Sequence, residues 1–310
     1  MRILIDKAAS LLKKGNVVAV PTETVYGLAA SLDLPQAIQD IYRLKGRPSN
    51  NPLIIHVAHF KDVFYFMQEH VSDLDLLARD FWPGPLTVIL PIKTKLIPSV
   101  ARANLPTAAF RIPQHSLALE LLRKTGPLVM PSANLSGKPS STQAQHVESD
   151  FGDHFPVLDG GACQKGLEST ILHFHERWTI IRQGSLVPAD FESTLGYRPS
   201  IENASTKESP ICPGQLYKHY APKAKLHLVD SFENISGKVI VGFSDRVYPS
   251  GCHLLSLGAI ADPYSCAGNL YAILRKLDAE NIEEAFVDIQ FPDQGILATL
   301  LERLQRASRN

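Results

Sequence analysis

The sequence predicts an α/β protein with two domains, a larger one on a mixed sheet and a small Rossmann-like one. Up to about residue 187, strand-like apolar runs and amphipathic helical stretches follow one another without strict βαβ alternation, which favours a mixed sheet. Residues 202–210 are polar and weakly patterned, as in a linker. Over roughly the last 85 residues, strands alternate with helices. We expect domains at 1–187 and 223–310, joined by a linker or lid at 188–222.

Each element of the first domain follows from a local pattern. The apolar run from Val17 to Val20 stops at Pro21, which indicates a buried strand. Pro35 opens a helix whose apolar side chains recur at helical spacing. Similar patterns predict further strands at 53–57, 86–90, 107–112, 127–130, 156–158, 169–174 and 178–182. Further helices are expected at 6–14, 63–69, 73–81 and 115–125.

The second domain shows a simpler order of elements. Its expected strands lie at 226–229, 238–243 and 285–289, and its expected helices at 266–279 and 296–306. This alternation is the basis for predicting a small Rossmann-like domain.

Composition narrows the class of protein. The 310 residues are 45% hydrophobic and carry 31 basic and 31 acidic side chains, so overall charge does not favour nucleic acid binding. The four cysteines form no C-x-x-C pair, which argues against a zinc ribbon and suits a reducing compartment. An acid at position 6 and the lack of a long apolar run argue against a signal peptide and a membrane span. We expect a soluble, cytoplasmic protein.

Two cations, Lys45 and Arg47, lie one residue apart at the end of a predicted helix. Cations there also complement a helix dipole, which is the structural alternative. Pro48 and Pro52 stiffen the loop that follows, just before a strand. A rigid pair of cations favours a receptor for a multiply charged anion, with phosphate first.

The loop after the first strand, Pro21 to Leu28, is rich in threonine. Its hydroxyls can bind a carboxylate, or they can simply cap a turn. His56 lies within a strand, where it is either a ligand contact or a hydrogen-bonded core histidine. Arg111 interrupts an apolar strand and needs a partner anion, either an internal acid or a substrate carboxylate.

Later loops carry further polar groups. Residues 131–140 hold hydroxyls, an amide and a glycine, suited to a nucleotide base and ribose or to a plain polar loop. Glycine-rich stretches at 159–161 and 166–170 match neither the P-loop nor the G-x-G-x-x-G spacing. Residues 213–222 combine aromatics with cations, which indicates a lid over a ligand or an anchor for the linker.

Together, these motifs resemble the YrdC/Sua-type threonylcarbamoyl-AMP synthases in their two-domain form. They occur in the order PTETVYGL, KGRPSNNPLIIHV, FWPGPLTVIL, TAAFRIP, MPSANLSGKPS, DGG, GLESTIL, IIRQGS and PGQLYKHYAP. The resemblance implies a YrdC-like domain with a large twisted mixed sheet and a concave ligand cavity. It implies a nucleotidyltransferase that converts L-threonine, bicarbonate or CO2, and ATP into threonylcarbamoyl-adenylate and pyrophosphate. The product serves the t6A modification of adenosine 37 in tRNAs that read ANN codons.

The same resemblance implies roles for individual residues. Lys45 and Arg47 would hold triphosphate oxygens and stabilise the departing pyrophosphate, as catalytic residues. The other implied ATP contacts are Asn51, Thr107, Ser132, Asn134, Ser140, Arg182 and Tyr217. The implied threonine contacts are Thr22, His56, Arg111 and Ser169, with Arg111 taking the carboxylate. Mg²⁺ is expected to be bound mainly through the ATP phosphates, with no metal ligand from the chain. A transient contact with the threonylcarbamoyl transferase is also implied.

Two other functions fit parts of the sequence. A double-stranded RNA-binding protein would use the basic concave face of the sheet, but cations gathered in one pocket favour a small ligand. A carbamoyl-transfer domain would use carbamoyl phosphate and need no threonine. It would be accompanied by further domains and by zinc-finger cysteines, neither of which the sequence shows.

Overall fold

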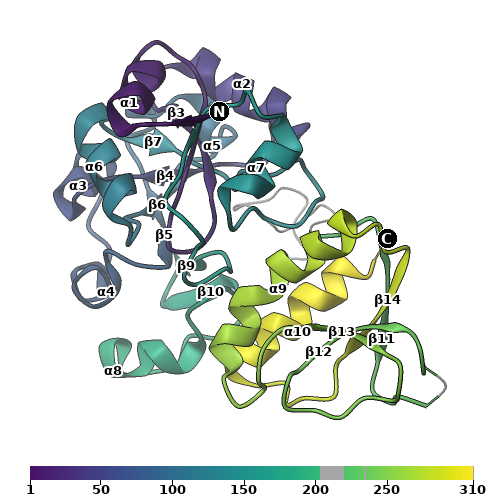
Figure 1. The fold of residues 1–310 in the computed structure, drawn as a ribbon. Coiled ribbons are helices and arrows are strands. Elements are labelled where there is room, and N and C mark those ends of the chain that lie inside the picture. Colours follow the sequence, from purple (N-terminus) through teal and green to yellow (C-terminus); the bar gives the residue numbers. More distant parts are fainter. Residues whose placement is uncertain (203–219, 234, 310) are drawn as a thin grey trace.

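The computed structural model describes residues 1–202, 220–233 and 235–309. The chain forms two α/β units, each with its own sheet (Figure 1). Within the described ranges, no helix is long and apolar enough to cross a membrane.

The first unit is built on a ten-stranded sheet with both parallel and antiparallel pairs, as predicted. Its strand order is β1-β8-β2-β3-β7-β4-β6-β5-β9-β10. The strands are β1 (Arg2–Ile3), β2 (Val18–Val20), β3 (Gly27–Ser31), β4 (Ile54–His56), β5 (Leu86–Pro91), β6 (Thr107–Arg111), β7 (Leu128–Val129), β8 (Val157–Leu158), β9 (Thr170–Phe174) and β10 (Trp178–Arg182). The central β4–β6 pair is parallel, whereas β7 joins β4 and β3 in antiparallel fashion.

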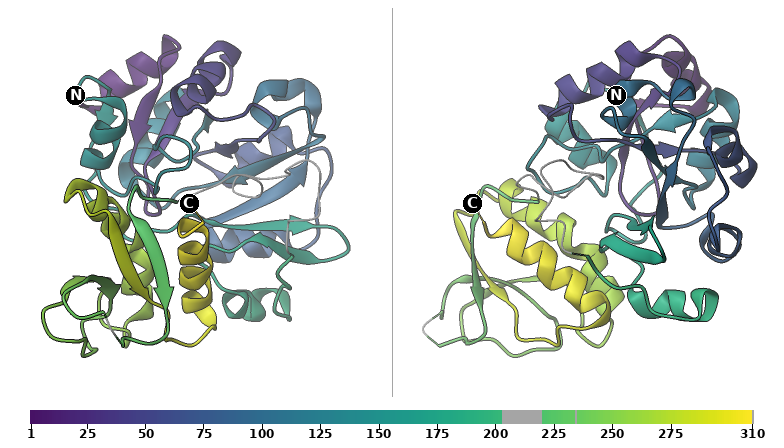
Figure 2. Two further views of the ribbon diagram at one scale, coloured as in Figure 1. Left: turned by 90° about the vertical axis from the view of Figure 1, so that its right-hand side faces the viewer. Right: turned by 180° about the vertical axis from the view of Figure 1, so that it is seen from behind.

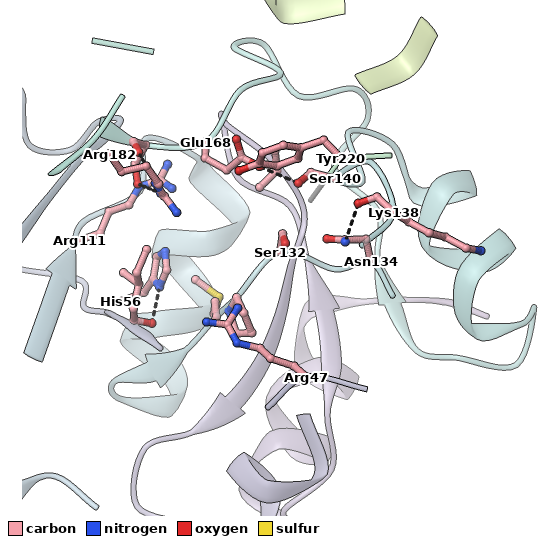
Figure 3. A pocket seen from close by; sticks show the side chains of 15 residues that line it. Arg47, His56, Arg111, Ser132, Asn134, Lys138, Ser140, Glu168, Arg182 and Tyr220 are labelled. Carbon is pink, nitrogen blue, oxygen red and sulfur yellow. Dashed lines mark hydrogen bonds between the residues drawn. The ribbon is translucent and has the colours of Figure 1, made fainter. Parts of the chain in front are cut away.

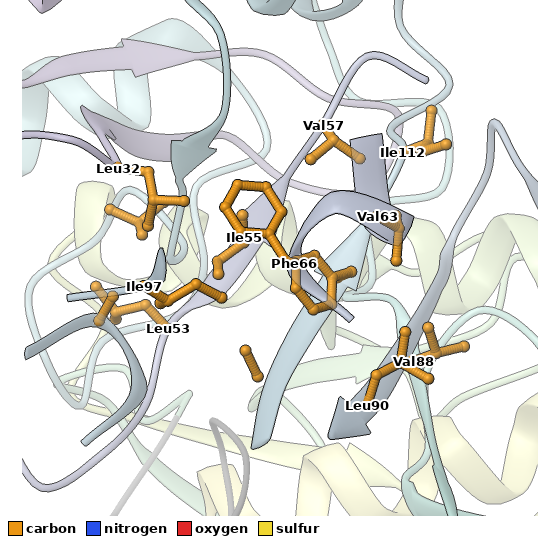
Figure 4. Close-up of a cluster of buried hydrophobic side chains, with 14 of the residues drawn as sticks. Leu32, Leu53, Ile55, Val57, Val63, Phe66, Val88, Leu90, Ile97 and Ile112 are labelled. Atoms are coloured by element: carbon orange, nitrogen blue, oxygen red, sulfur yellow. The ribbon is translucent and has the colours of Figure 1, made fainter. Parts of the chain in front are cut away.

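Short helices pack on this sheet and close its core. They are α1 (Ile5–Lys13), α2 (Pro35–Lys45), α3 (Phe60–Phe66), α4 (Leu74–Phe81), α5 (Ser99–Arg102), α6 (Ser116–Thr125), α7 (Ala144–Phe151) and α8 (Glu192–Leu195), with 3-10 turns η1 (Thr94–Leu96) and η2 (Pro188–Phe191). Figure 4 shows part of the core, where Phe66 of α3 lies beside Ile55 of β4 and Val88 of β5. Burial of such side chains is the main term that stabilises the unit.

The sequence analysis missed several elements of the first unit. β3 begins at Gly27, inside the threonine-rich segment, and pairs with β2, so this segment is a short connection between two strands. Helix α7 follows the polar loop at 131–140 and was not predicted.

The first part of the predicted linker has regular structure against the first unit. Residues 188–195 form η2 and α8, and Phe191 of η2 packs on Phe81 of α4, with ring centroids 4.8 Å apart. Ile201 then makes a parallel bridge with Ile180 of β10.

The second unit has a four-stranded, entirely parallel sheet in the order β11-β14-β12-β13, which confirms the predicted small Rossmann-like domain. Its strands are β11 (Lys225–Val229), β12 (Val239–Gly242), β13 (His253–Ser256) and β14 (Glu284–Asp288); β13 was not predicted. Helices α9 (Pro263–Ala279) and α10 (Gly295–Ala307) lie between this sheet and the first unit (Figures 1 and 2).

The two units meet closely along α9. Val25, Leu167 and Val187 of the first unit belong to the apolar cluster that forms the core of the second. Gly166 lies so close to Gly268 of α9 that a Cβ at position 166 would stand 1.8 Å from the Gly268 carbonyl oxygen. Only glycine permits this approach, and Gly166 also has a φ of +61°. The contact holds the loop that carries Glu168 and Ser169 against the second unit.

Candidate functional site

A cavity that is partly open to solvent lies beside the contact between the two units. In Figure 3, His56, Arg111 and Arg182 lie on one side, Asn134 and Lys138 on the other, and Ser132 between them. The lining residues are Val25, Arg47, Ile54, His56, Arg111, Met130, Pro131, Ser132, Asn134, Lys138, Ser140, Glu168, Ser169, Arg182 and Tyr220. Eight of the predicted site residues are therefore brought together: Arg47, His56, Arg111, Ser132, Asn134, Ser140, Ser169 and Arg182.

Arg47 reaches the cavity because the chain turns sharply at the end of α2. Gly46 ends this helix in the left-handed conformation, with a φ of +61°. The Arg47 guanidinium then donates to the carbonyls of Asn51 and Pro52, at 3.3 and 3.0 Å. These bonds bind the arginine to the loop that leads into β4, so its charge is held at the cavity wall.

Lys45 points inward, but it is not among the lining residues. Its ammonium donates to the carbonyls of Ser132 and Asn134, at 2.5 and 2.6 Å, and the residue is 3% exposed. Burial, together with the nearby Arg47 charge, lowers the pKa of Lys45 well below its ordinary value. In this arrangement Lys45 fixes the loop that carries Ser132 and Asn134.

His56 and Arg111 are neighbours because β4 and β6 pair in parallel with these two residues in register. The His56 Nδ1 lies 3.2 Å from the Ile54 carbonyl, which can only accept, so Nδ1 carries the proton and Nε2 is an acceptor. Burial first, and then the Arg111 charge, lower the pKa of His56 well below its ordinary value. The imidazole is therefore neutral at pH 7.

Arg111 finds the partner that its buried charge requires. Glu23, from the threonine-rich loop, forms an ion pair with the Arg111 Nη2 at 2.7 Å, and the Gly84 carbonyl accepts from Nε at 3.2 Å. Of the two alternatives, the structure shows the internal acid. Among the described residues no hydrogen bond occupies the Arg111 Nη1, so the guanidinium can also serve a ligand.

Ser169 and Arg182 form the part of the wall above Arg111. The Arg182 Nη2 donates to the Ser169 carbonyl at 2.9 Å and to its Oγ at 3.0 Å. The Ser169 Oγ also lies 2.7 Å from the Thr87 Oγ1 on β5. These bonds fix the serine hydroxyl and the guanidinium side by side.

The polar loop supplies the opposite wall. The Asn134 amide donates to the carbonyls of Leu135 and Lys138, and its Oδ1 has no hydrogen bond among the described residues. The Ser140 hydroxyl donates to the Glu168 carboxylate at 2.7 Å. An unsatisfied buried amide oxygen is costly, so it marks a place where a ligand donor can bind.

Besides Lys45, four predicted residues are not placed at the wall. The Thr22 hydroxyl accepts from the Thr24 and Val25 amides and donates to the Val25 carbonyl, so it stabilises its own turn. Asn51 is buried, with its Oδ1 unpaired within the described chain. Thr107 begins β6, four residues and about 13 Å from Arg111. Tyr217 lies outside the described residues, so its predicted contact stays a prediction.

Sequence reasoning missed two acids, one lysine (Lys138) and one tyrosine that shape the site. Glu23 lies in the threonine-rich loop and Glu168 in the glycine-rich stretch at 166–170, so an acid inside such a motif was the available signal. Tyr220, three residues beyond the predicted Tyr217, lines the cavity and stacks on Tyr271 of α9, with ring centroids 5.2 Å apart. The end of the linker is thus anchored at the cavity.

Glu168 connects the cavity to the second unit. Its carboxylate accepts from the Tyr271 hydroxyl at 2.7 Å and pairs with the Arg303 Nε at 3.5 Å. Burial raises the pKa of Glu168, but Arg303, Arg182 and the hydrogen bonds outweigh burial, and the pKa lies below its ordinary value. Glu168 is therefore ionised at pH 7 and balances the surrounding arginines.

The lining residues favour an anionic ligand. Arg47, Arg111, Lys138 and Arg182 supply four cations, whereas Glu168 is the one carboxylate among the described residues of the wall. The described residues contain no cluster of three or more potential metal ligands, so a cation here would depend on ligands from a bound anion.

Known proteins share both units of this chain. Residues 10–184 match the family model described as Telomere recombination, and residues 187–309 match the model Threonylcarbamoyl-AMP synthase, C-terminal domain. The threonylcarbamoyl-AMP synthase of Bacillus subtilis is 38% identical, over 98% of this chain and 92% of that protein. The Pyrococcus abyssi enzyme of the same name is 35% identical, over 97% and 93%.

A solved structure matches the whole fold. The crystal structure of Pyrococcus abyssi Sua5 complexed with L-threonine superposes with a TM-score of 0.90 and 32% identity, covering 99% of this chain and 96% of that one. The match includes the large mixed sheet, the smaller parallel sheet and the arrangement of the two. The chain therefore belongs to the two-domain threonylcarbamoyl-AMP synthase family.

Proposed function

We propose that this protein is an L-threonylcarbamoyladenylate synthase. It converts L-threonine, bicarbonate or CO2, and ATP into threonylcarbamoyl-AMP and pyrophosphate, as a nucleotidyltransferase. One observation carries the proposal. A single cavity joins a His56–Arg111–Ser169 end, suited to a small amino acid, to a wall with Arg47 and a hydroxyl- and amide-bearing loop, suited to a nucleotide.

Threonine is proposed to bind at the end formed by β4, β6 and Ser169. Arg111 binds its carboxylate, because a guanidinium matches carboxylate geometry and Glu23 leaves part of it available. The neutral His56 accepts from a threonine donor through Nε2, and Ser169 offers a fixed hydroxyl. Thr22, which holds the adjacent turn, supports this end from behind.

ATP is proposed to bind along the other walls. Arg47 holds triphosphate oxygens, and Arg182 neutralises a further phosphate charge. Ser132, Asn134 and Ser140 bind the ribose or base, with the unpaired Asn134 Oδ1 ready to accept a donor. Lys45, Asn51, Thr107 and Tyr217 remain proposed contacts of the bound nucleotide, and Lys45 also holds the loop through two carbonyls.

The chemistry is an in-line displacement. The threonine amine takes up CO2 to form a carbamate, whose oxygen attacks the α-phosphorus of ATP while the bond to the pyrophosphate oxygen breaks. Arg47 stabilises the negative charge of the leaving pyrophosphate, and the two ends of the cavity align the reactants. Mg²⁺ would be held mainly by the ATP phosphates and would neutralise part of their charge, because Glu168, the one carboxylate among the described lining residues, is already paired with Arg303.

The product is a mixed anhydride, so it must be used by an acyl transfer. We propose that it feeds the t6A modification of tRNAs that read ANN codons, through transient contact with a threonylcarbamoyl transferase in the cytoplasm. An RNA-binding function has less support, because Arg111 and Arg182 point into the cavity and not along an extended surface (Figure 3).

The test is pyrophosphate release from ATP, with threonine and bicarbonate each omitted in turn. We expect release only when both are present, together with a product of the mass of threonylcarbamoyl-AMP. Release without threonine, or a turnover that needs carbamoyl phosphate, would refute the assignment. A filter-binding titration of duplex RNA against salt serves as a parallel check, and a steep salt dependence at nanomolar affinity would favour the RNA-binding function.

A further inference from the structure

Two buried arginines of the second unit, Arg275 of α9 and Arg303 of α10, reach into the first unit, and Arg275 contacts the polar loop of the cavity. Arg275 is 9% exposed, and every hydrogen bond of its guanidinium recorded among the described residues goes to residues 139–150 of the first unit. A guanidinium of the second unit is thus the partner of a loop that forms one wall of the cavity.

The contacts of Arg275 lie at the end of the wall loop, residues 134–141. Its Nη2 donates to the Pro139 carbonyl at 2.6 Å and to the Ser141 hydroxyl at 3.2 Å, and its Nε donates to the carbonyls of Pro139 and Ser140 at 3.1 and 3.3 Å. Ser140 lines the cavity with its hydroxyl on Glu168. The backbone on both sides of this hydroxyl is therefore held by Arg275.

Asp150 connects Arg275 to the start of the wall loop. It pairs with the Arg275 Nη2 at 2.8 Å, accepts from the Leu135 amide at 3.1 Å and binds the Lys138 ammonium at 3.0 Å. Its side chain is 1% exposed, so this carboxylate depends on its cationic partners. Arg275 and Asp150 together hold residues 135, 138, 139 and 140 in one network of hydrogen bonds and ion pairs. Arg275 and Asp150 themselves are 125 residues apart in the sequence.

We propose that Arg275 is a positioning residue for the nucleotide side of the cavity, acting through the wall loop and Asp150. This inference rests on the proposed function, and it adds a role for the second unit: α9 completes the geometry of the ATP-binding wall. No hydrogen bond of the Arg275 guanidinium recorded among the described residues goes to β4 or β6, so the threonine end on these strands is expected to be independent of Arg275.

The chemistry of arginine makes the proposal specific. Its Nη1 and Nη2 donate to the two carboxylate oxygens of Asp150, while Nε and Nη2 donate to the Pro139 carbonyl, so all three nitrogens of the planar fork are used. The single nitrogen of a lysine ammonium cannot serve both edges of this fork. Arg275→Lys keeps the charge opposite Asp150 but loses the fork. It therefore separates positioning from simple charge balance.

The test compares Arg275→Lys and Arg275→Ala with the wild-type protein and with Lys276→Ala. Lys276 is the next residue on α9, is half exposed and pairs with Glu280, so it is a matched control. For Arg275→Lys we expect the KM for ATP to rise by at least tenfold while the KM for threonine changes less than threefold. Free guanidinium at millimolar concentration is expected to restore part of the ATP affinity of Arg275→Ala. Lys276→Ala is expected to match the wild type.

Amide hydrogen exchange gives a readout that does not depend on activity. In Arg275→Lys, the amides of residues 135–138, 140 and 141 are expected to exchange at least tenfold faster, with little change in β4 and β6. Unchanged exchange, or equal effects on the two KM values, would overturn the positioning role. If the wild type releases no pyrophosphate, the proposed function fails, and the exchange experiment still decides whether Arg275 holds the loop.

Discussion

At the residue scale, two neighbouring cations have different contacts and therefore different roles. Lys45 and Arg47 appear equivalent in the sequence. In the structure, Lys45 donates hydrogen bonds to two backbone carbonyls, whereas Arg47 lines the cavity. Replacing Lys45 by alanine would leave buried carbonyls without a donor, at a cost of about 1–3 kcal/mol each. Loss of activity in that variant would therefore report loop geometry as well as phosphate binding, and Arg47 is the cleaner probe.

Arg47→Ala is expected to reduce pyrophosphate release by at least about 100-fold, because a fixed charge at the leaving group is lost. Arg43→Ala, in the last turn of the helix that precedes Arg47 and with an exposed side chain paired to Asp40, is the control and is expected to stay within about twofold of wild type. Steady-state kinetics and thermal unfolding measure both variants. Equal activities in the two variants would remove Arg47 from the mechanism.

His56 makes stability depend on pH. Burial and Arg111 lower its pKa in the folded state, so below about pH 6.5 the unfolded chain binds more protons and stability falls as the pH falls. One such group costs about 1.4 kcal/mol between pH 7.5 and 5.5. His146, whose pKa burial and Arg275 lower to about 4, acts in the same direction.

Comparison with His56→Asn isolates the contribution of His56, because every other group titrates in both proteins. Urea unfolding at the two pH values is expected to show a loss that is smaller in the variant by about 1.4 kcal/mol. The same loss in both proteins would mean that His56 is not held neutral.

The sequence identified most of the residues at the wall but few of their partners. Arg111 plainly required an anion, but which of 31 acids supplies it depends on how the loop at Glu23 folds back on β6. The sequence also did not show whether the Lys45 side chain points inward or outward, because a lysine at the end of a helix can do either with the same local sequence pattern. Such choices are tertiary, and no spacing rule encodes them.

At the element scale, the sheet was predicted where strands are apolar and β-branched, and missed where they are not. β3 is made of Gly27-Leu28-Ala29-Ala30-Ser31, which lacks the β-branched residues that mark a strand. It exists because β2 and β7 flank it and all five of its residues are buried. By contrast, α2, α4, α6, α9 and α10 have strong helical patterns, and they lie within a few residues of the predicted bounds.

Helix α10 contributes the Arg303–Glu168 ion pair, which joins it to the loop at the cavity. Arg303→Met is expected to destabilise the protein by about 3 kcal/mol, because Glu168 is left as a buried charge without its main partner. Adding Glu168→Gln is expected to recover at least about 1 kcal/mol.

Gln305→Ala, at an exposed position of α10, is the control for the Arg303 variant and is expected to change stability by less than about 0.5 kcal/mol. Urea unfolding of Arg303→Met, Glu168→Gln, the double variant and Gln305→Ala provides the measurement. Strict additivity of the Arg303 and Glu168 changes would show that the pair does not couple the two units.

At the scale of the whole molecule, the two units share a core and a polar network. Val25, Leu167 and Val187 pack in the second unit, while Arg275 and Arg303 reach into the first. A unit that depends on its neighbour for buried contacts cannot unfold alone without exposing them. We therefore expect both units to unfold in a single transition.

The distribution of tryptophan allows a direct check. Both tryptophans, Trp82 and Trp178, lie in the first unit, so their fluorescence follows that unit, whereas far-UV circular dichroism follows both. The midpoints in urea are expected to coincide. A separate, earlier or later change in the dichroism signal would show that the second unit unfolds by itself.

The whole account depends on one cavity that binds an amino acid and a nucleoside triphosphate at the same time. A crystal structure with L-threonine, Mg²⁺ and a non-hydrolysable ATP analogue tests it most directly. The account predicts the threonine carboxylate on Arg111 beside His56 and Ser169, with the triphosphate on Arg47. An empty cavity, or ligands bound elsewhere while Arg47 turns to solvent, would contradict it.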